Sequence, residues 1–185
     1  MTSRNVKFAT LALLVPSVMS LVAPGLADAS IPQLKMDRVH LAEANKTNTY
    51  IKDGTIVGGD RAIDDVIVLD IRHAANPDYE RIVLDLEGNR SGEPAAINRA
   101  PYYSVSVTPD MKRLVVTLFG KPKLAFSPRK VVKNFRKSSL VEKLELLPIV
   151  EKDRWTFVMN MKGSQPVEVF ELSNPVRVIL DLKKK

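Results

Sequence analysis

A seven-residue strand pattern occurs twice in this chain, at residues 80–86 (ERIVLDL) and 176–182 (VRVILDL), with Arg, Leu, Asp and Leu at four matching positions. Side chains alternate between the two faces of a strand, so Arg81 and Asp85 point one way, roughly 13 Å apart at about 3.3 Å per residue, and the apolar residues Ile82 and Leu84 point the other. The second copy repeats this arrangement. The pattern predicts two related strands, each with a core face and a charged face.

Each seven-residue pattern belongs to a series of four strand-like segments separated by turns rich in Gly, Pro, Asn and Asp. It is the second segment of the first series and the last segment of the second series. The segments are residues 66–71, 81–87, 102–107 and 113–119, and then 144–150, 155–161, 167–172 and 176–182. Eight short strands with turn punctuation predict an all-β fold. A single four-stranded sheet would leave one face wet, so we expect a β-sandwich of two stacked four-stranded sheets, built from a duplicated four-strand unit.

Matched turn residues support duplication over chance similarity between Val-rich and Ile-rich strands. Gly88 corresponds to Gly163, Pro101 to Pro166, and Arg113 to Arg177. We therefore divide residues 64–185, the expected β domain, into copies at about 64–120 and 141–183. Residues 30–63 form a partly irregular lead segment, with a short helix expected around residues 35–44 and a strand around residues 49–57.

A basic connector, residues 121–140, separates the two copies and is expected to form a short helix at residues 127–138. It carries seven cations and no acid within 17 residues: Lys121, Lys123, Arg129, Lys130, Lys133, Arg136 and Lys137. A run of this kind is most often the solvent-exposed face of a helix. The alternative is a binding site for anionic lipid or glycan phosphate.

Residues 1–29 have the features of a secretory signal: Arg4 and Lys7, an apolar stretch interrupted by Pro16, and a small-x-small cleavage site ending at Ala29. The alternative is a membrane anchor, but the stretch falls short of about 18 uninterrupted apolar residues. We expect cleavage after Ala29, a periplasmic location and no stable membrane span after processing.

Charge and composition limit the partners of an exported chain. Removing residues 1–29 lowers the net charge only from +7 to +6. A basic exported protein suits anionic wall polymers, lipid head groups or acidic proteins, whereas nucleic acid is not expected as a partner. The chain has no cysteine, so its core alone must hold it together.

Catalytic patterns are weak. The two histidines, His40 and His73, lie in different segments without metal-ligand spacing, and no nucleophile motif is present. Asp70 and Asp85 could in principle serve a glycosidase, but acids on adjacent strands more often face solvent. We expect no catalysis, no metal and no cofactor.

Residues 170–182 (FELSNPVRVILDL) resemble the AMIN domain family: a strand, an Asn-Pro turn, then Arg and an apolar strand ending in Asp-Leu. Residues 79–88 (YERIVLDLEG) followed by 101–107 resemble its AMIN-like variant. The likeness covers residues 65–182; in the first copy, residues 110–113 (DMKR) replace Asn-Pro-x-Arg. The resemblance implies a two-sheet β fold in the cell envelope that binds peptidoglycan and localises other activities, often fused to amidases or secretins. Here we expect a stand-alone module.

The residues expected to contact such a ligand are Arg81, Asp85, Arg113, Arg177 and Asp181. Peptidoglycan offers carboxylates, amides and hydroxyls, which suit Arg forks and hydrogen-bonding groups on a fixed sheet. For each residue alone, a cross-strand ion pair is the commoner role. We therefore expect a non-catalytic module that binds peptidoglycan or another anionic envelope polymer. The alternative is a protein-interaction module that docks an envelope assembly, such as a pilus secretin complex or a wall hydrolase.

Overall fold

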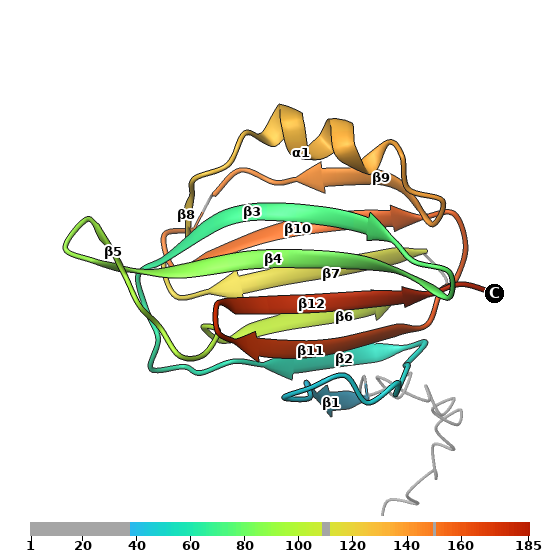
Figure 1. Cartoon of the computed structure of the whole chain (residues 1–185), viewed down its shortest axis with the longest axis horizontal. Coiled ribbons are helices and arrows are strands. Elements are labelled where there is room, and N and C mark those ends of the chain that lie inside the picture. The colour runs from blue at the N-terminus through green and yellow to red at the C-terminus, as the bar shows by residue number, and fades with distance from the viewer. Residues whose placement is uncertain (1–37, 109–111, 150) are drawn as a thin grey trace, which may run out of the picture. The chain divides into compact units, whose positions relative to one another are not determined.

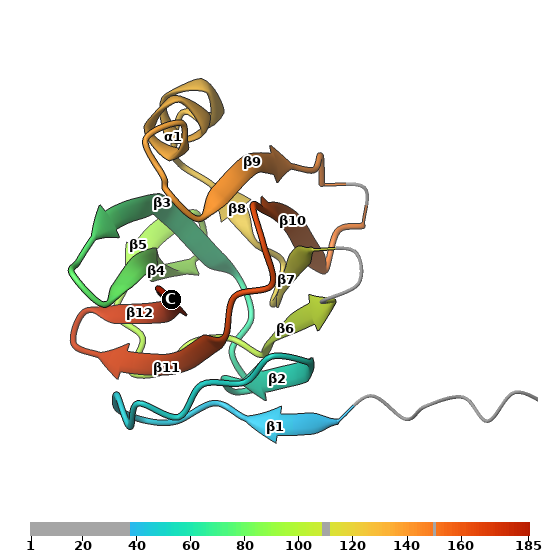
Figure 2. The same ribbon diagram turned by 90° about the vertical axis from the view of Figure 1, so that its right-hand side faces the viewer.

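The computed structural model describes residues 38–108, 112–149 and 151–185, so the expected signal at residues 1–29 lies outside the described residues. The strands form two sheets, sheet A and sheet B, and Figure 2, which views the strands nearly end-on, shows the sheets facing each other. Among the described residues, no helix combines the length and the apolar character needed to cross a membrane.

Each sheet contains six strands. In order across sheet A these are β1 (Val39–Leu41), β2 (Gly54–Gly58), β6 (Tyr103–Thr108), β7 (Arg113–Phe119), β10 (Arg154–Met161) and β9 (Val141–Leu146). Sheet B has β11 (Val167–Ser173), β12 (Val176–Lys183), β4 (Tyr79–Arg90), β3 (Val66–Ala75) and β8 (Lys123–Leu124), with β5 (Glu93–Ala95) paired to β4. Neighbours are antiparallel except β1 with β2 and β3 with β8 (Figure 1).

The all-β prediction is confirmed, and so is the short helical connector, which is α1 (Pro128–Phe135). The expectation of four strands in each sheet is wrong, because β1 and β2 extend sheet A while β5 and β8 extend sheet B. The expectation that each copy stacks as its own sheet is also wrong. Each copy instead gives one hairpin to each sheet.

The two sheets are built from hairpins of both halves of the chain. Hairpins β3–β4 and β11–β12 lie in sheet B, and β6–β7 and β9–β10 lie in sheet A; β12 joins β4, and β10 joins β7. The long insertion after β4 leads the chain from sheet B to sheet A (Figure 1). Because the two hairpins of each four-strand segment lie in different sheets, each hairpin buries one face against the other sheet. A single open sheet could not bury these faces.

The core lies between the sheets and follows the alternation seen in the sequence. Ile82 and Leu84 of β4 are fully buried, as are Trp155 and Phe157 of β10. Burying a large apolar side chain contributes about 1.5–3 kcal/mol, so these strands hold the two layers together. The core is what fixes the outward-facing side chains in place.

The lead segment belongs to the β structure. In the described part of residues 35–44 the expected helix is wrong, because residues 39–41 pair with β2 as a strand. Further along, Glu43 and Ile51 exchange backbone hydrogen bonds with β11. This pairing covers the outer edge of β11, and an exposed sheet edge is a liability that proteins commonly cover.

Helix α1 lies over the opening between β3 of sheet B and β9 of sheet A (Figure 2). Ser127 precedes it and Pro128 occupies its first turn, a position that proline favours because its missing N–H would be unpaired there anyway. Val131 and Phe135 point into the core. The basic side chains are therefore left on the outside of the helix.

Candidate functional site

Four of the five predicted ligand residues lie together on the outer face of sheet B. Arg81 and Asp85 come from β4, and Arg177 and Asp181 come from β12. The register sets Arg81 directly opposite Asp181, and Asp85 directly opposite Arg177. Each arginine of one copy therefore faces the aspartate of the other copy.

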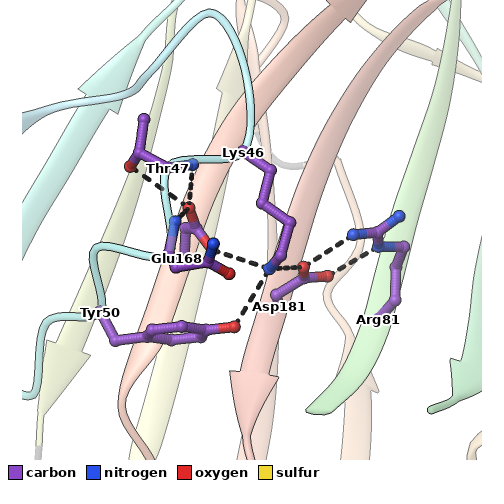
Figure 3. Close-up of polar contacts among 7 residues, drawn as sticks. Lys46, Thr47, Tyr50, Arg81, Glu168 and Asp181 are labelled. Carbon is purple, nitrogen blue, oxygen red and sulfur yellow. Dashed lines mark hydrogen bonds and ion pairs between the residues drawn. The ribbon is translucent and has the colours of Figure 1, made fainter. Parts of the chain in front are cut away.

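The first of these pairs is part of a charge cluster built around two buried carboxylates, the Lys46 cluster, formed by Lys46, Arg81, Glu168 and Asp181 (Figure 3). Arg81 donates two hydrogen bonds to Asp181, at 2.7 and 2.8 Å, and the Asp181 side chain is 0% exposed. The Lys46 ammonium lies between Asp181, at 2.6 Å, and Glu168, at 2.9 Å. This cluster attaches the lead segment to sheet B.

The surroundings of Lys46 and Glu168 favour the charged forms of both side chains. Burial lowers the pKa of Lys46, but hydrogen bonds to Asp181, Glu168 and Tyr50 outweigh it and raise this pKa above its ordinary value. Burial raises the pKa of Glu168, but hydrogen bonds from Lys46 and from the backbone N–H groups of Thr47 and Asn48 lower it overall. The Tyr79 ring also lies 4.4 Å from the ammonium, within range of a cation–π contact.

We predict that Lys46→Met lowers the free energy of unfolding by about 2 kcal/mol, since hydrogen bonds to charged groups contribute about 1.5–3 kcal/mol. Each carboxylate keeps other donors, which limits the loss. Urea unfolding measures the change, and faster amide exchange at Ile51 would show that the lead segment loosens. The exposed Lys52→Met, in the same segment, is the matched control; equal effects of the two substitutions would contradict the account.

The second pair forms an open cluster, the Asp85 cluster, made of Arg72, Asp85 and Arg177. Arg72 of β3 donates to both carboxylate oxygens of Asp85, at 2.5 and 2.8 Å, and Arg177 donates through Nε at 3.1 Å. The Arg72 side chain is half exposed. Within the described residues, the side chain of Arg177 donates only through its Nε, so its terminal nitrogens remain available to a ligand.

Arg113, the fifth predicted ligand residue, is not brought to this face. It begins β7 in sheet A, where its partner in the register is Asn160 of β10. A ligand on the outer face of sheet B would therefore not contact it.

The seven basic connector residues separate into groups. Arg129, Lys130 and Lys133 lie on α1, Arg136 and Lys137 directly follow it, and all five are exposed. Lys123 lies in β8, and Lys121 forms an ion pair with Asp64 at 2.9 Å. The structure therefore gathers five of the seven cations around the helix.

An open groove of about 410 Å³ lies between α1 and the outer face of sheet B, and we name it the β3–α1 groove. Its lining residues are Asp70, Arg72, His73, Ala74, Val83, Lys130, Asn134 and Lys137. Arg72 belongs both to this groove and to the Asp85 cluster. None of the five predicted ligand residues lines the groove, but Asp85 is bonded to its lining residue Arg72. Two residues of the predicted basic connector, Lys130 and Lys137, do line it.

Glu80 fixes one wall of this groove. Its carboxylate, 1% exposed, accepts hydrogen bonds from the Ser138 hydroxyl at 2.5 Å, from the Ser139 N–H at 2.7 Å and from the Ser139 hydroxyl, and it contacts His73 Nε2 at 2.8 Å. Burial raises the pKa of Glu80, but the bonds from Ser138, Ser139 and His73 outweigh it and lower the pKa to about 2. Glu80 therefore ties the chain after α1 to β4 and β3.

Sequence reasoning missed Lys46, Arg72, Glu80 and Glu168. One of them carried a signal: Glu80 has the same strand parity as Ile82 and Leu84, and a charge on the core side of a strand indicates a buried partner. Lys46 carried none, because it lies in a segment without periodicity.

Comparison with models of known protein families and with curated proteins finds no match to this chain. The likeness to AMIN domains therefore rests on the quoted motifs alone.

Proposed function

We propose that this chain is an exported, AMIN-type cell-envelope module that binds peptidoglycan without catalysis and works in the periplasm after cleavage following Ala29. The main structural support for this proposal is the β3–α1 groove. There Arg72, Lys130 and Lys137 converge beside a sheet that is held by its core.

The chemistry of the groove matches that of a peptide stem on a glycan strand. Carboxylates of the stem suit Arg72, whose planar fork binds them with two parallel hydrogen bonds, and the two lysines as point charges. Asn134 offers an amide for the peptide backbone, and Asp70 offers a carboxylate for a free amine. A site with both signs of charge suits this mixed ligand better than it suits a plain polyanion.

Strand register supports the proposal of internal duplication. Arg177 lies opposite Asp85, three residues before Gly88, and Arg113 lies opposite Asn160, three residues before Gly163. Both sheets therefore repeat the pairing of the last strand of one copy with the second strand of the other. An equal register in both sheets favours duplication over chance similarity between Val-rich strands.

A second function, docking to an envelope protein, is favoured by the edge strand β1. Its side chains Val39 and Leu41 are 67% and 80% exposed, and β1 ends sheet A. An exposed apolar edge strand can add a strand from a partner.

We predict that Arg72→Gln/Lys130→Gln/Lys137→Gln weakens binding to purified peptidoglycan sacculi about tenfold, because three solvent-exposed charge contacts are lost at about 0.2–1 kcal/mol each. A pull-down with increasing amounts of sacculi measures the affinity. The control Arg99→Gln/Lys143→Gln/Lys152→Gln removes the same charge from exposed positions outside the groove.

Equal binding by the two triple variants would contradict the groove as the wall site. Binding to crude envelopes that disappears when proteins are stripped from the sacculi would favour the docking function instead. Both variants lose exposed ion pairs, so each should be less stable than the parent chain by about 1 kcal/mol or less. Equal thermal unfolding of the two variants shows that a difference in binding reports on contacts rather than on folding.

A further inference from the structure

The opposite flank of α1 carries a second groove, the α1–β9 groove, of about 490 Å³. It is lined by Pro128, Arg129, Val132, Lys133, Arg136 and Leu146. Three of these residues are cations, three are apolar, and no acid lines the groove within the described part of the chain. This mixture differs from the β3–α1 groove, where Asp70 and Asn134 accompany the cations.

The loop after β9 continues the apolar part of this groove outward. Leu147 and Ile149 follow Leu146 and are 40% and 41% exposed. The indole N–H of the buried Trp155 donates to the carbonyl of Leu147 at 2.9 Å, which fixes the start of the loop. Large apolar side chains are thus held in the open beside a cluster of cations.

We propose that the α1–β9 groove and the 147–149 loop form a docking surface for an anionic phospholipid bilayer. Arg129, Lys133 and Arg136 contact lipid phosphates, and Leu147 and Ile149 enter the boundary between head groups and acyl chains. Basic residues beside exposed apolar ones are the composition that binds at membrane surfaces.

The combination of charge and apolar exposure selects this partner. An acidic wall polymer would satisfy the three cations but would leave Leu147 and Ile149 in water. Three acids lie near the loop, and each has a cation beside it. Glu151 is paired with Arg154, Glu145 is bonded to Lys143, and Asp153 directly follows the exposed Lys152, so these acids do not cancel the attraction. The inference does not depend on peptidoglycan binding, since it uses the other flank of the helix.

Co-sedimentation with vesicles of phosphatidylcholine and phosphatidylglycerol tests the proposal, with pure phosphatidylcholine vesicles for comparison. The exported protein is purified in the form its cell produces, so that all variants share one N-terminus. Arg129→Gln/Lys133→Gln/Arg136→Gln should weaken binding to the anionic vesicles about 100-fold, because each basic residue near an anionic surface contributes about fivefold. Leu147→Ser/Ile149→Ser should weaken it about tenfold.

The matched control is Arg72→Gln/Lys130→Gln/Lys137→Gln, which removes the same charge from the other flank of α1 and should stay within about threefold of the parent chain. A tryptophan placed by Ile149→Trp should shift its fluorescence to the blue on anionic vesicles only. The proposal would be overturned if both triple variants lost the same vesicle affinity, or if the parent chain bound neutral vesicles as well as anionic ones. It would also be overturned if Leu147→Ser/Ile149→Ser left the affinity unchanged. Preference for a soluble acidic peptide over vesicles would overturn it as well.

Discussion

Asp181→Ala is expected to lower the free energy of unfolding by about 3–5 kcal/mol, the cost of breaking a buried ion pair from one side. The Asp181 side chain is fully buried and accepts from both Arg81 and Lys46. Its removal leaves both cations partly buried without that carboxylate. The lead segment should loosen in the same variant, because Glu168 is then the one acidic partner left to Lys46 among the residues that the structure describes.

The matched control is Asp85→Ala. Asp85 also bridges two cations on the same sheet, but its side chain is 18% exposed and Arg72 is half exposed, so a loss of about 1 kcal/mol or less is expected. Urea unfolding of both variants measures the difference. Similar losses for the two substitutions would show that burial does not distinguish the Lys46 cluster from the Asp85 cluster.

Acid is expected to remove about 3 kcal/mol of stability through Glu80 alone. In the folded chain the pKa of Glu80 is lowered from 4.5 to about 2, so the folded state favours the ionised form. One pKa unit corresponds to about 1.4 kcal/mol, which gives a contribution of about 3 kcal/mol. This contribution is complete above pH 4.5 and is lost progressively as the pH falls towards 2.

Urea unfolding between neutral pH and pH 2 measures this loss, and Glu80→Gln is the comparison. The variant should be less stable at neutral pH, because a neutral amide accepts more weakly from Ser138 and Ser139, and its stability should fall less steeply with acid. Glu168, whose pKa is also lowered, accounts for a remaining acid dependence. A Glu80→Gln variant with the slope of the parent chain would contradict the assignment to Glu80.

The positions of the long strands were predictable from the sequence because apolar residues alternate along several of them, as in β6, β7 and β10. In β10, alternate side chains from Trp155 to Met161 are buried, as a period of two requires. The turns were predictable because Gly and Pro interrupt the apolar alternation between strands. Alternation assigns a strand to a core face but carries no information about which strand is its neighbour.

The partners of the strands were therefore not predictable. Pairing of β12 with β4 joins residues about a hundred positions apart, and it is stabilised by the contacts of Arg81 with Asp181 and of Arg177 with Asp85. Those four residues had been recognised as one face of each strand, but the sequence did not show that the two faces belong to one sheet. Arg113 matches Arg177 in the sequence and yet lies in sheet A, because the β6–β7 hairpin pairs with β10 there, whereas the β11–β12 hairpin pairs with β4 in sheet B.

The candidate site was predictable in part. A basic helix and a charged strand face were both expected, but the groove between them depends on how α1 packs over β3, and that packing depends on Val131, Phe135 and the buried Glu80. The matched glycines Gly88 and Gly163 show the same limit. A Cβ atom at Gly88 would come within 2.6 Å of the Ile97 side chain, whereas a Cβ atom at Gly163 would lie 3.4 Å from the Gln165 side chain. Close packing therefore excludes a side chain at the first position but not at the second, although the two glycines match in the sequence.

The proposed wall site can be mapped by NMR, from the amide shifts that soluble peptidoglycan fragments cause in the isotopically labelled protein. We expect the shifts to concentrate at Arg72, Asn134 and Lys137, around the β3–α1 groove, and to spare Arg113 in sheet A. Shifts confined to sheet A, or no shifts at saturating fragment, would contradict the proposed site.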